Sequence, residues 1–144
     1  MIKDDYDFDY LIIGSGFGGS VSAHRLSEKG YSVAVMEMGK RWEAKDFPKT
    51  NWNTPKWIWR PAINFFGFFN LRIFRHVAII CGNAVGGGSI TYANTLLVPP
   101  SSVWSEGTWG KIPHLKEDIP QYFAEAERML GVTDNKIFGP ADHM

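Results

Sequence analysis

The sequence predicts an α/β fold in which short parallel strands are joined through a helix. An apolar run at 10–13 ends abruptly at a glycine, and a second, valine-rich run covers 32–36. Between them lies a helical pattern that contains Val21, Ala23 and Leu26 and closes at Gly30. Short apolar runs of this kind are typical of buried strands in a parallel sheet. A strand, a helix and a strand in this order predict a βαβ unit.

The turn between the first strand and the helix carries the spacing G-x-G-x-x-G, with Gly14, Gly16 and Gly19 at its three glycine positions. In a dinucleotide site the first glycine permits the tight turn, the second lets backbone N–H groups approach a pyrophosphate, and the third lets helix and strand pack closely. The helix N-terminus attracts phosphate. Glu37 ends the second strand, where it can accept hydrogen bonds from a ribose diol and repel a 2′-phosphate. Together these features predict a Rossmann-like dinucleotide-binding unit.

A second glycine cluster follows the apolar run 77–80, which we interpret as another short buried strand. It contains Gly82 and then the run Gly86, Gly87, Gly88 and Ser89. Successive backbone N–H groups in such a turn can form a concavity that binds an anion. An NAD site does not normally need a second loop of this kind, whereas an extended FAD could use one. The other interpretation is a glycine-rich connection without a ligand. Three adjacent glycines lose much conformational entropy on folding, which argues against a turn that makes no compensating contact.

At these residues the sequence resembles the glucose-methanol-choline (GMC) flavoprotein oxidoreductases, and most of all their cholesterol oxidase branch. Val85 followed by three glycines and a serine matches the loop of that branch, and Glu37-Met38-Gly39 matches the ending of the family's early fingerprint. The similarity continues through Asn94-Thr95-Leu96 and 126–131, and so spans nearly the whole chain. One departure is Tyr92, which stands where many members of the family have asparagine.

The resemblance implies FAD as the cofactor and hydride transfer from an alcohol carbon to the flavin. It implies an apolar alcohol as substrate, with a 3β-hydroxysteroid as the first choice. The catalytic histidine and its partner lie near the C-terminus in that family, so the catalytic residues stay unassigned here. The predicted cofactor-binding residues are Gly14, Ser15, Gly16, Phe17, Gly18, Gly19, Glu37, Met38, Gly82, Val85, Gly86, Gly87, Gly88, Ser89 and Asn94.

Composition narrows the possible classes of protein. The chain has 144 residues and a formal net charge of zero, which gives no electrostatic case for a nucleic-acid partner. Its one cysteine, Cys81, excludes an intrachain disulfide, and we interpret it as a small buried side chain. The acidic N-terminus lacks the basic start of a secretory signal, and no apolar run is long enough to span a bilayer. We expect a cytoplasmic protein without a metal site, in which peripheral membrane contact stays open.

The segment 42–74 is rich in aromatic residues and prolines, which argues against long regular elements. Its rings could fill a core against further protein, form a wall over an apolar substrate, or touch a membrane. Further along, 116–130 has the spacing of an amphipathic helix that ends at Gly131.

Because a complete doubly wound domain has five or six strands, residues 1–144 are expected to be the N-terminal part of an FAD-binding domain. The substrate domain and the catalytic C-terminal part, which a separate chain could supply, are then absent. Two alternatives to an oxidoreductase portion stay open. They are a non-catalytic remnant that binds NAD or ADP weakly, and a membrane-surface module.

Overall fold

A computed structural model describes residues 6–139 of the chain. It divides the chain into two compact units, of which the first ends at Asn94 and the second begins at Thr95.

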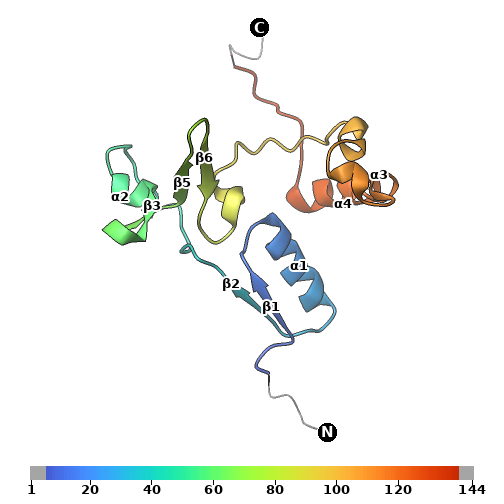
Figure 1. Ribbon diagram of the computed structural model, residues 1–144, viewed down its shortest axis with the longest axis horizontal. Coiled ribbons are helices and arrows are strands. Elements are labelled where there is room, and N and C mark those ends of the chain that lie inside the picture. Colours follow the sequence, from blue (N-terminus) through green and yellow to red (C-terminus); the bar gives the residue numbers. More distant parts are fainter. Residues whose placement is uncertain (1–5, 140–144) are drawn as a thin grey trace. The chain divides into compact units, whose positions relative to one another are not determined.

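The first unit opens with the predicted βαβ unit (Figure 1). Strand β1 (Tyr10–Ile13) pairs in parallel with β2 (Val33–Met36), and helix α1 (Phe17–Glu28) packs on both. Gly14 makes the turn out of β1 at φ +94°, and Gly30, at φ +87°, follows the C-terminus of α1. Both backbone angles lie in the left-handed region that glycine adopts without strain. The Rossmann-like prediction is confirmed for this part of the chain.

The prediction that the first strand is buried is wrong for the described residues. Ile12 faces α1, because its side chain lies close to Gly19. Leu11 and Ile13 point to the opposite face of the strand and are exposed, Ile13 to 86%. The sheet has only two described strands, and α1 covers only one of its faces. The strand therefore has more apolar side chains than the described residues bury.

The aromatic segment forms short elements, as its prolines predict. They are α2 (Thr54–Trp57), β3 (Trp59–Arg60), the 3₁₀ turn η1 (Pro61–Ile63), β4 (Phe65–Phe66) and β5 (Phe69–Ile73). Strands β3 and β4 pair antiparallel. Phe68 is 3% exposed, and the rings of Trp42, Phe47, Trp57 and Phe69 lie around it with centroids 4.7–5.1 Å away. This ring cluster is the best-buried apolar contact of the segment.

Strand β6 (Ala78–Gly82) corresponds to the predicted strand at 77–80, with two corrections. It pairs antiparallel with β5 in a hairpin, in the register Phe69↔Gly82 to Ile73↔Ala78, and does not extend the parallel sheet. Its side chains are exposed rather than buried, and Cys81 is exposed with them. In an antiparallel hairpin the backbone hydrogen bonds are satisfied by the neighbouring strand alone, so burial of both faces is not required.

The second unit consists of short helices. They are the 3₁₀ turns η3 (Ser101–Ser105) and η4 (Trp109–Lys111), and helices α3 (Leu115–Asp118) and α4 (Pro120–Leu130). The single helix predicted at 116–130 is divided before Pro120, which has no N–H to continue the hydrogen-bond ladder. Gly131 ends α4 at φ +66°, as predicted. Within residues 6–139, no helix is both long and apolar enough to cross a membrane.

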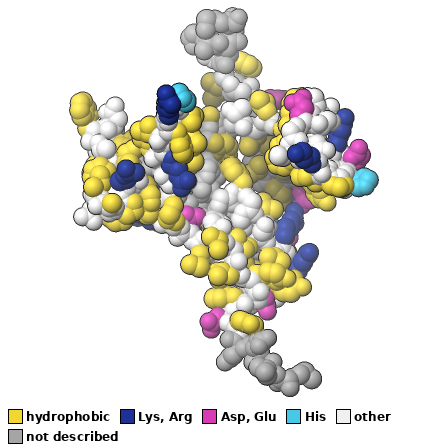
Figure 2. Space-filling model, in the orientation of Figure 1, with side chains coloured by type: hydrophobic (Ala, Val, Ile, Leu, Met, Phe, Trp, Pro, Cys, Tyr) yellow, Lys and Arg dark blue, Asp and Glu magenta, His cyan; other side chains and the backbone are white. Residues whose placement is uncertain are grey.

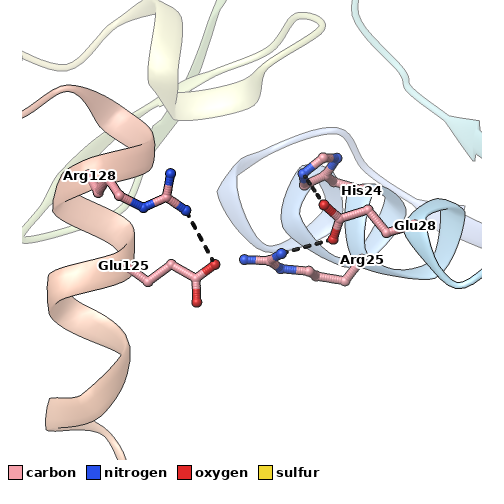
Figure 3. A network of polar contacts seen from close by, with 5 residues as sticks. All are labelled: His24, Arg25, Glu28, Glu125 and Arg128. Atoms are coloured by element: carbon pink, nitrogen blue, oxygen red, sulfur yellow. Dashed lines mark hydrogen bonds and ion pairs between the residues drawn. The ribbon is translucent and has the colours of Figure 1, made fainter.

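Each of the two longest helices, α1 and α4, carries ion pairs on its surface. On α1, Glu28 Oε1 lies 3.2 Å from His24 Nε2 and Glu28 Oε2 lies 2.8 Å from Arg25 Nη1; on α4, Arg128 Nη2 lies 3.9 Å from Glu125 Oε1 (Figure 3). The hydrogen bond from Arg25 holds the pKa of Glu28 below its usual value. Exposed pairs of this kind contribute little to stability.

Candidate functional site: two glycine turns

The first glycine turn has the geometry that each of its glycines predicts. A Cβ at Gly19 would overlap the carbonyl oxygen of Gly14, so the third glycine permits the close approach of α1 to the end of β1. A Cβ at Gly16 would have nothing within 4 Å, which leaves space in front of the turn. The amide of Gly14 donates to the carbonyl of Met36 at 2.7 Å and ties the turn to the end of β2.

The N-terminus of α1 presents unpaired donors beside that space. Gly16 is the N-cap residue and has no side chain to cap the helix. The first amides of a helix have no acceptor within the helix itself and carry the positive end of its dipole. The neighbouring Phe17 and Gly18 are exposed. The turn can therefore receive an anion such as a phosphate.

Glu37 lies directly behind this turn. Its Oε2 accepts hydrogen bonds from the backbone N–H of Ser15 at 2.9 Å and from the Ser15 hydroxyl at 2.7 Å, and its Oε1 accepts from the N–H of Gly39 at 2.9 Å. Burial raises the pKa of Glu37, but these hydrogen bonds lower it by more, so the pKa lies below its usual value. A carboxylate has about four acceptor positions. Three of them take the hydrogen bonds above, and the backbone N–H of Met38 also lowers the pKa of Glu37, so the carboxylate is engaged mainly within the chain.

The second glycine turn follows the end of β6 and runs into the 3₁₀ turn η2 (Gly87–Ile90). Gly86 and Gly87 have φ values of +102° and +56°, which favour glycine. The Ser89 hydroxyl donates to the carbonyl of Gly86 at 2.8 Å and closes the turn. A Cβ at Gly82 would lie 2.5 Å from the carbonyl oxygen of Gly87, so this glycine also permits a close backbone approach.

The structure brings the two turns into direct contact. The N–H of Gly86 donates to the Ser15 hydroxyl oxygen at 3.0 Å, and a Cβ at Gly87 would lie 2.9 Å from Gly16 Cα. A Cβ at Gly88 would lie 4.0 Å from the ring of Phe17. The two glycine clusters, about 70 residues apart in the chain, therefore form one backbone-lined surface.

The segment after Glu37 holds the second turn from another side. The N–H of Val85 donates to the carbonyl of Lys40 at 3.2 Å. A Cβ at Gly39 would overlap the carbonyl group of Asn83 and lie 2.5 Å from Ala84 Cα. The intervening Met38 is exposed. The end of β2 thus contacts both turns.

Asn94 also reaches this region, although indirectly. Its Oδ1 accepts a hydrogen bond from the Tyr92 hydroxyl at 2.7 Å, and the Tyr92 ring meets the Phe17 ring edge-on with centroids 5.6 Å apart. Tyr92, the departure from the family pattern, therefore connects Asn94 to the first turn.

One buried polar side chain at the start of the second turn, Asn83, was not among the predicted site residues. Asn83 is 4% exposed, and its Nδ2, like Nε1 of Trp42, has no hydrogen-bond partner among the described residues. A buried donor without an acceptor is energetically unfavourable, so an acceptor for either group would stabilise this part of the chain. The position of Asn83 immediately after Gly82 was the signal that could have found it. Across residues 6–139, no group of three His, Cys, Asp or Glu side chains could hold a metal ion.

Comparison with known proteins bears directly on this region. Residues 12–44, which hold the first turn and Glu37, match the NAD(P)-binding Rossmann-like domain family. Over all of its length the chain is 74% identical to a cholesterol oxidase from Acinetobacter baumannii, of which it covers 26%. It is 45% identical over 96% of its length to a cholesterol oxidase from Mycobacterium tuberculosis, of which it covers 24%.

The chain is homologous to the cholesterol oxidases. It is also 28% identical, over 66% of its length, to an uncharacterised GMC-type oxidoreductase of Mycobacterium tuberculosis, of which it covers 15%. The resemblance inferred from the two glycine clusters is therefore confirmed. The chain spans about a quarter of the length of the cholesterol oxidases that it matches.

Proposed function

We propose that this chain is the cofactor-binding portion of an FAD-dependent alcohol oxidoreductase of the GMC type. The observation that carries the proposal is the contact between the two glycine turns, through Gly86 and Ser15 and through Gly87 and Gly16. A cofactor with one pyrophosphate and a long ring system at each end fits a surface that two turns line together. A single turn would serve a smaller nucleotide equally well.

The residues of the first unit fit such a cofactor. The open space before Gly16 and the N-terminus of α1 suit the pyrophosphate, and the negative charge of Glu37 disfavours a 2′-phosphate. The second turn offers further backbone N–H groups next to this position. FAD, when bound, would supply the ring that accepts a hydride from an alcohol carbon, while the protein supplies binding and orientation.

For the substrate we propose a sterol or another apolar alcohol, by similarity to the cholesterol oxidases. The groups that act on the hydroxyl are proposed to lie in a C-terminal half, on the same polypeptide or supplied separately. The exposed apolar face of β1, with Leu11 and Ile13, offers a surface that further protein of this kind could cover.

Titration with FAD, NAD, NADP and ADP tests the proposed function. We expect the full chain to bind FAD at least about tenfold more tightly than the other three, as measured by quenching of FAD fluorescence and by equilibrium dialysis. Equal affinity for all four would contradict the proposal and favour a non-catalytic nucleotide-binding remnant.

A matched pair of variants locates the binding surface. Gly16→Val places a side chain in the open space before the turn, at an extended backbone angle that valine tolerates and where a Cβ has no protein atom within 4 Å. It should lower stability slightly, because valine is a poorer N-cap residue than glycine, and weaken FAD binding at least about tenfold. Ser22→Ala, at an exposed position further along α1, is the control and should retain binding. Equal binding by both variants and the wild type would place the cofactor elsewhere.

A second proposal concerns contact with a membrane surface. The end of the β5–β6 hairpin exposes the apolar Ile73, Phe74 and Val77 beside the cations Arg72 and Arg75. Hydrophobic and basic side chains gather over this part of the molecule (Figure 2). An apolar tip flanked by positive charge suits an anionic lipid surface.

Co-sedimentation with vesicles of anionic phospholipid tests this second proposal. Replacing Ile73 and Phe74 by serine should abolish co-sedimentation, whereas replacing the exposed Trp52 by serine should not. Binding that survives the double replacement would rule out the hairpin tip as the contact.

A further inference from the structure

The Ser15 side chain occupies the junction of three segments of the first unit. It is 8% exposed, although it lies in a glycine-rich turn. Its Oγ is 2.7 Å from Oε2 of Glu37, at the end of β2, and 3.0 Å from the amide nitrogen of Gly86, in the second turn. We call this chain of contacts, Gly86 to Ser15 to Glu37, the Ser15 bridge.

The direction of both hydrogen bonds in the bridge follows from the chemistry of the groups. A backbone N–H only donates, so Ser15 Oγ accepts from Gly86. The hydroxyl has a single proton, and an ionised carboxylate only accepts, so that proton is donated to Glu37. The backbone N–H of Ser15 is donated to the same carboxylate oxygen. Neither donor of Ser15 is then available to a phosphate.

This use of both donors changes the role that the sequence predicted for Ser15. From its position in the glycine motif, Ser15 was predicted to bind the cofactor. We propose instead that Ser15 is a positioning residue, whose hydroxyl fixes the second glycine turn against the first and leaves cofactor contact to neighbouring residues. The inference rests on the proposed FAD site for its consequence, but the bridge itself exists in the cofactor-free chain.

The close approach of the two turns explains why a side chain of this size is needed. A Cβ at Gly87 would lie 2.9 Å from Gly16 Cα. Even a small change in the spacing between the two turns therefore alters the contact between their backbones. The hydrogen bond from Val85 to Lys40 fixes the second turn on one side, through backbone atoms alone. The Ser15 hydroxyl fixes it on the side that faces the first turn. Its removal should free Gly86 without breaking the Lys40 contact.

Three variants of Ser15 test the inference in the full chain. Ser15→Ala removes the hydroxyl, and Ser15→Thr and Ser15→Val have the same shape as each other but differ in the hydroxyl. Ser22→Ala is the control, because Ser22 is an exposed serine on α1, the helix that follows the first turn. The first measurement is hydrogen exchange at the Gly86 amide without cofactor. The second is the dissociation constant for FAD.

We expect Gly86 exchange to rise at least about tenfold in Ser15→Ala and in Ser15→Val relative to Ser15→Thr, since each loses a hydrogen bond that shields the amide. The FAD dissociation constant should rise about tenfold in the same two variants. Ser22→Ala should match the wild type in both measurements. If Ser15→Ala fails to fold, the comparison of threonine with valine still isolates the hydroxyl.

Several results would overturn the inference. A wild-type Gly86 amide that exchanges as fast as that of an unstructured glycine would show that the bridge does not form. Weaker FAD binding in Ser15→Ala with unchanged Gly86 exchange would make Ser15 a direct ligand. Faster Gly86 exchange with unchanged FAD binding would show that the spacing of the turns does not matter. If the wild type binds no FAD, the proposed function fails, while the exchange data still decide whether the bridge exists.

Discussion

The two glycine turns and the aromatic segment between them are held together by different kinds of contact. In the first turn at Gly19, and beside the second turn at Gly39, two backbone segments lie so close that even a methyl group would overlap other atoms. In the aromatic segment, side-chain rings pack around Phe68 with centroids about 5 Å apart. Backbone contacts leave no room for substitution, whereas ring contacts can be repacked. The glycines, which have no side chain, are therefore the residues that tolerate substitution least.

The largest effect is expected at Gly39. Gly39→Ala places a Cβ among backbone atoms of Asn83 and Ala84, which cannot move without shifting the second turn. We expect a loss of about 3 kcal/mol in the free energy of unfolding, measured by urea denaturation. Gly18→Ala, in the open part of α1, should be stabilising by about 0.5–1 kcal/mol. Equal effects of the two changes would mean that the segment after β2 does not contact the second turn.

Gly87 separates backbone strain from crowding. Gly87 and Gly107 have similar positive φ values, +56° and +54°, but only Gly87 has a close neighbour, at Gly16. Gly107→Ala should destabilise by about 1 kcal/mol through strain alone. Gly87→Ala should destabilise by about 2 kcal/mol, because crowding adds to the strain. Thermal unfolding of both variants measures the difference. Equal destabilisation of the two variants would contradict a contact between the turns.

Phe68 tests the other side of the comparison. Phe68→Leu keeps an apolar side chain in the ring cluster, so neighbouring rings can close part of the space; we expect a loss of about 1.5 kcal/mol. Trp52→Leu, at a side chain that is 89% exposed, should change stability by less than about 0.5 kcal/mol. Denaturant midpoints of the two variants provide the measurement. A loss at Phe68 as large as that at Gly39 would remove the proposed distinction between ring and backbone contacts.

The smallest effect is a pH dependence at Glu37. Because the folded pKa of Glu37 lies below its usual value of 4.5, its contribution to stability is complete above that value and is lost as pH falls through the folded pKa. Glu37→Gln should cost about 1 kcal/mol at pH 7 and flatten the loss of stability below pH 4.5.

Glu28→Gln is the control for this pH dependence. The hydrogen bond from Arg25 also lowers the pKa of Glu28, but this pair is exposed on α1, so the change should be smaller. Unfolding by urea between pH 3 and pH 7 gives both profiles. An unchanged acid profile in Glu37→Gln would show that the carboxylate does not hold the first turn.

The sequence predicted the local elements well where the residue type itself has a clear structural role, such as a glycine at a turn. The βαβ unit, the positions of Gly14 and Glu37, and the end of α4 at Gly131 follow from turn geometry and strand patterns, and the structure confirms them. Burial was predicted less well. Ile13 and Cys81 are apolar enough for a core, yet burial depends on what packs against a strand.

For the candidate site, the sequence by itself determined which backbone positions lack side chains, and therefore where a phosphate could approach. Only the tertiary structure decided that the turns at Gly16 and Gly87 touch, and that the Ser15 hydroxyl donates to Glu37 and accepts from Gly86. The physical reason is that glycine spacing reports local backbone freedom, whereas a hydrogen bond between residues about 70 positions apart depends on how the intervening strands pack.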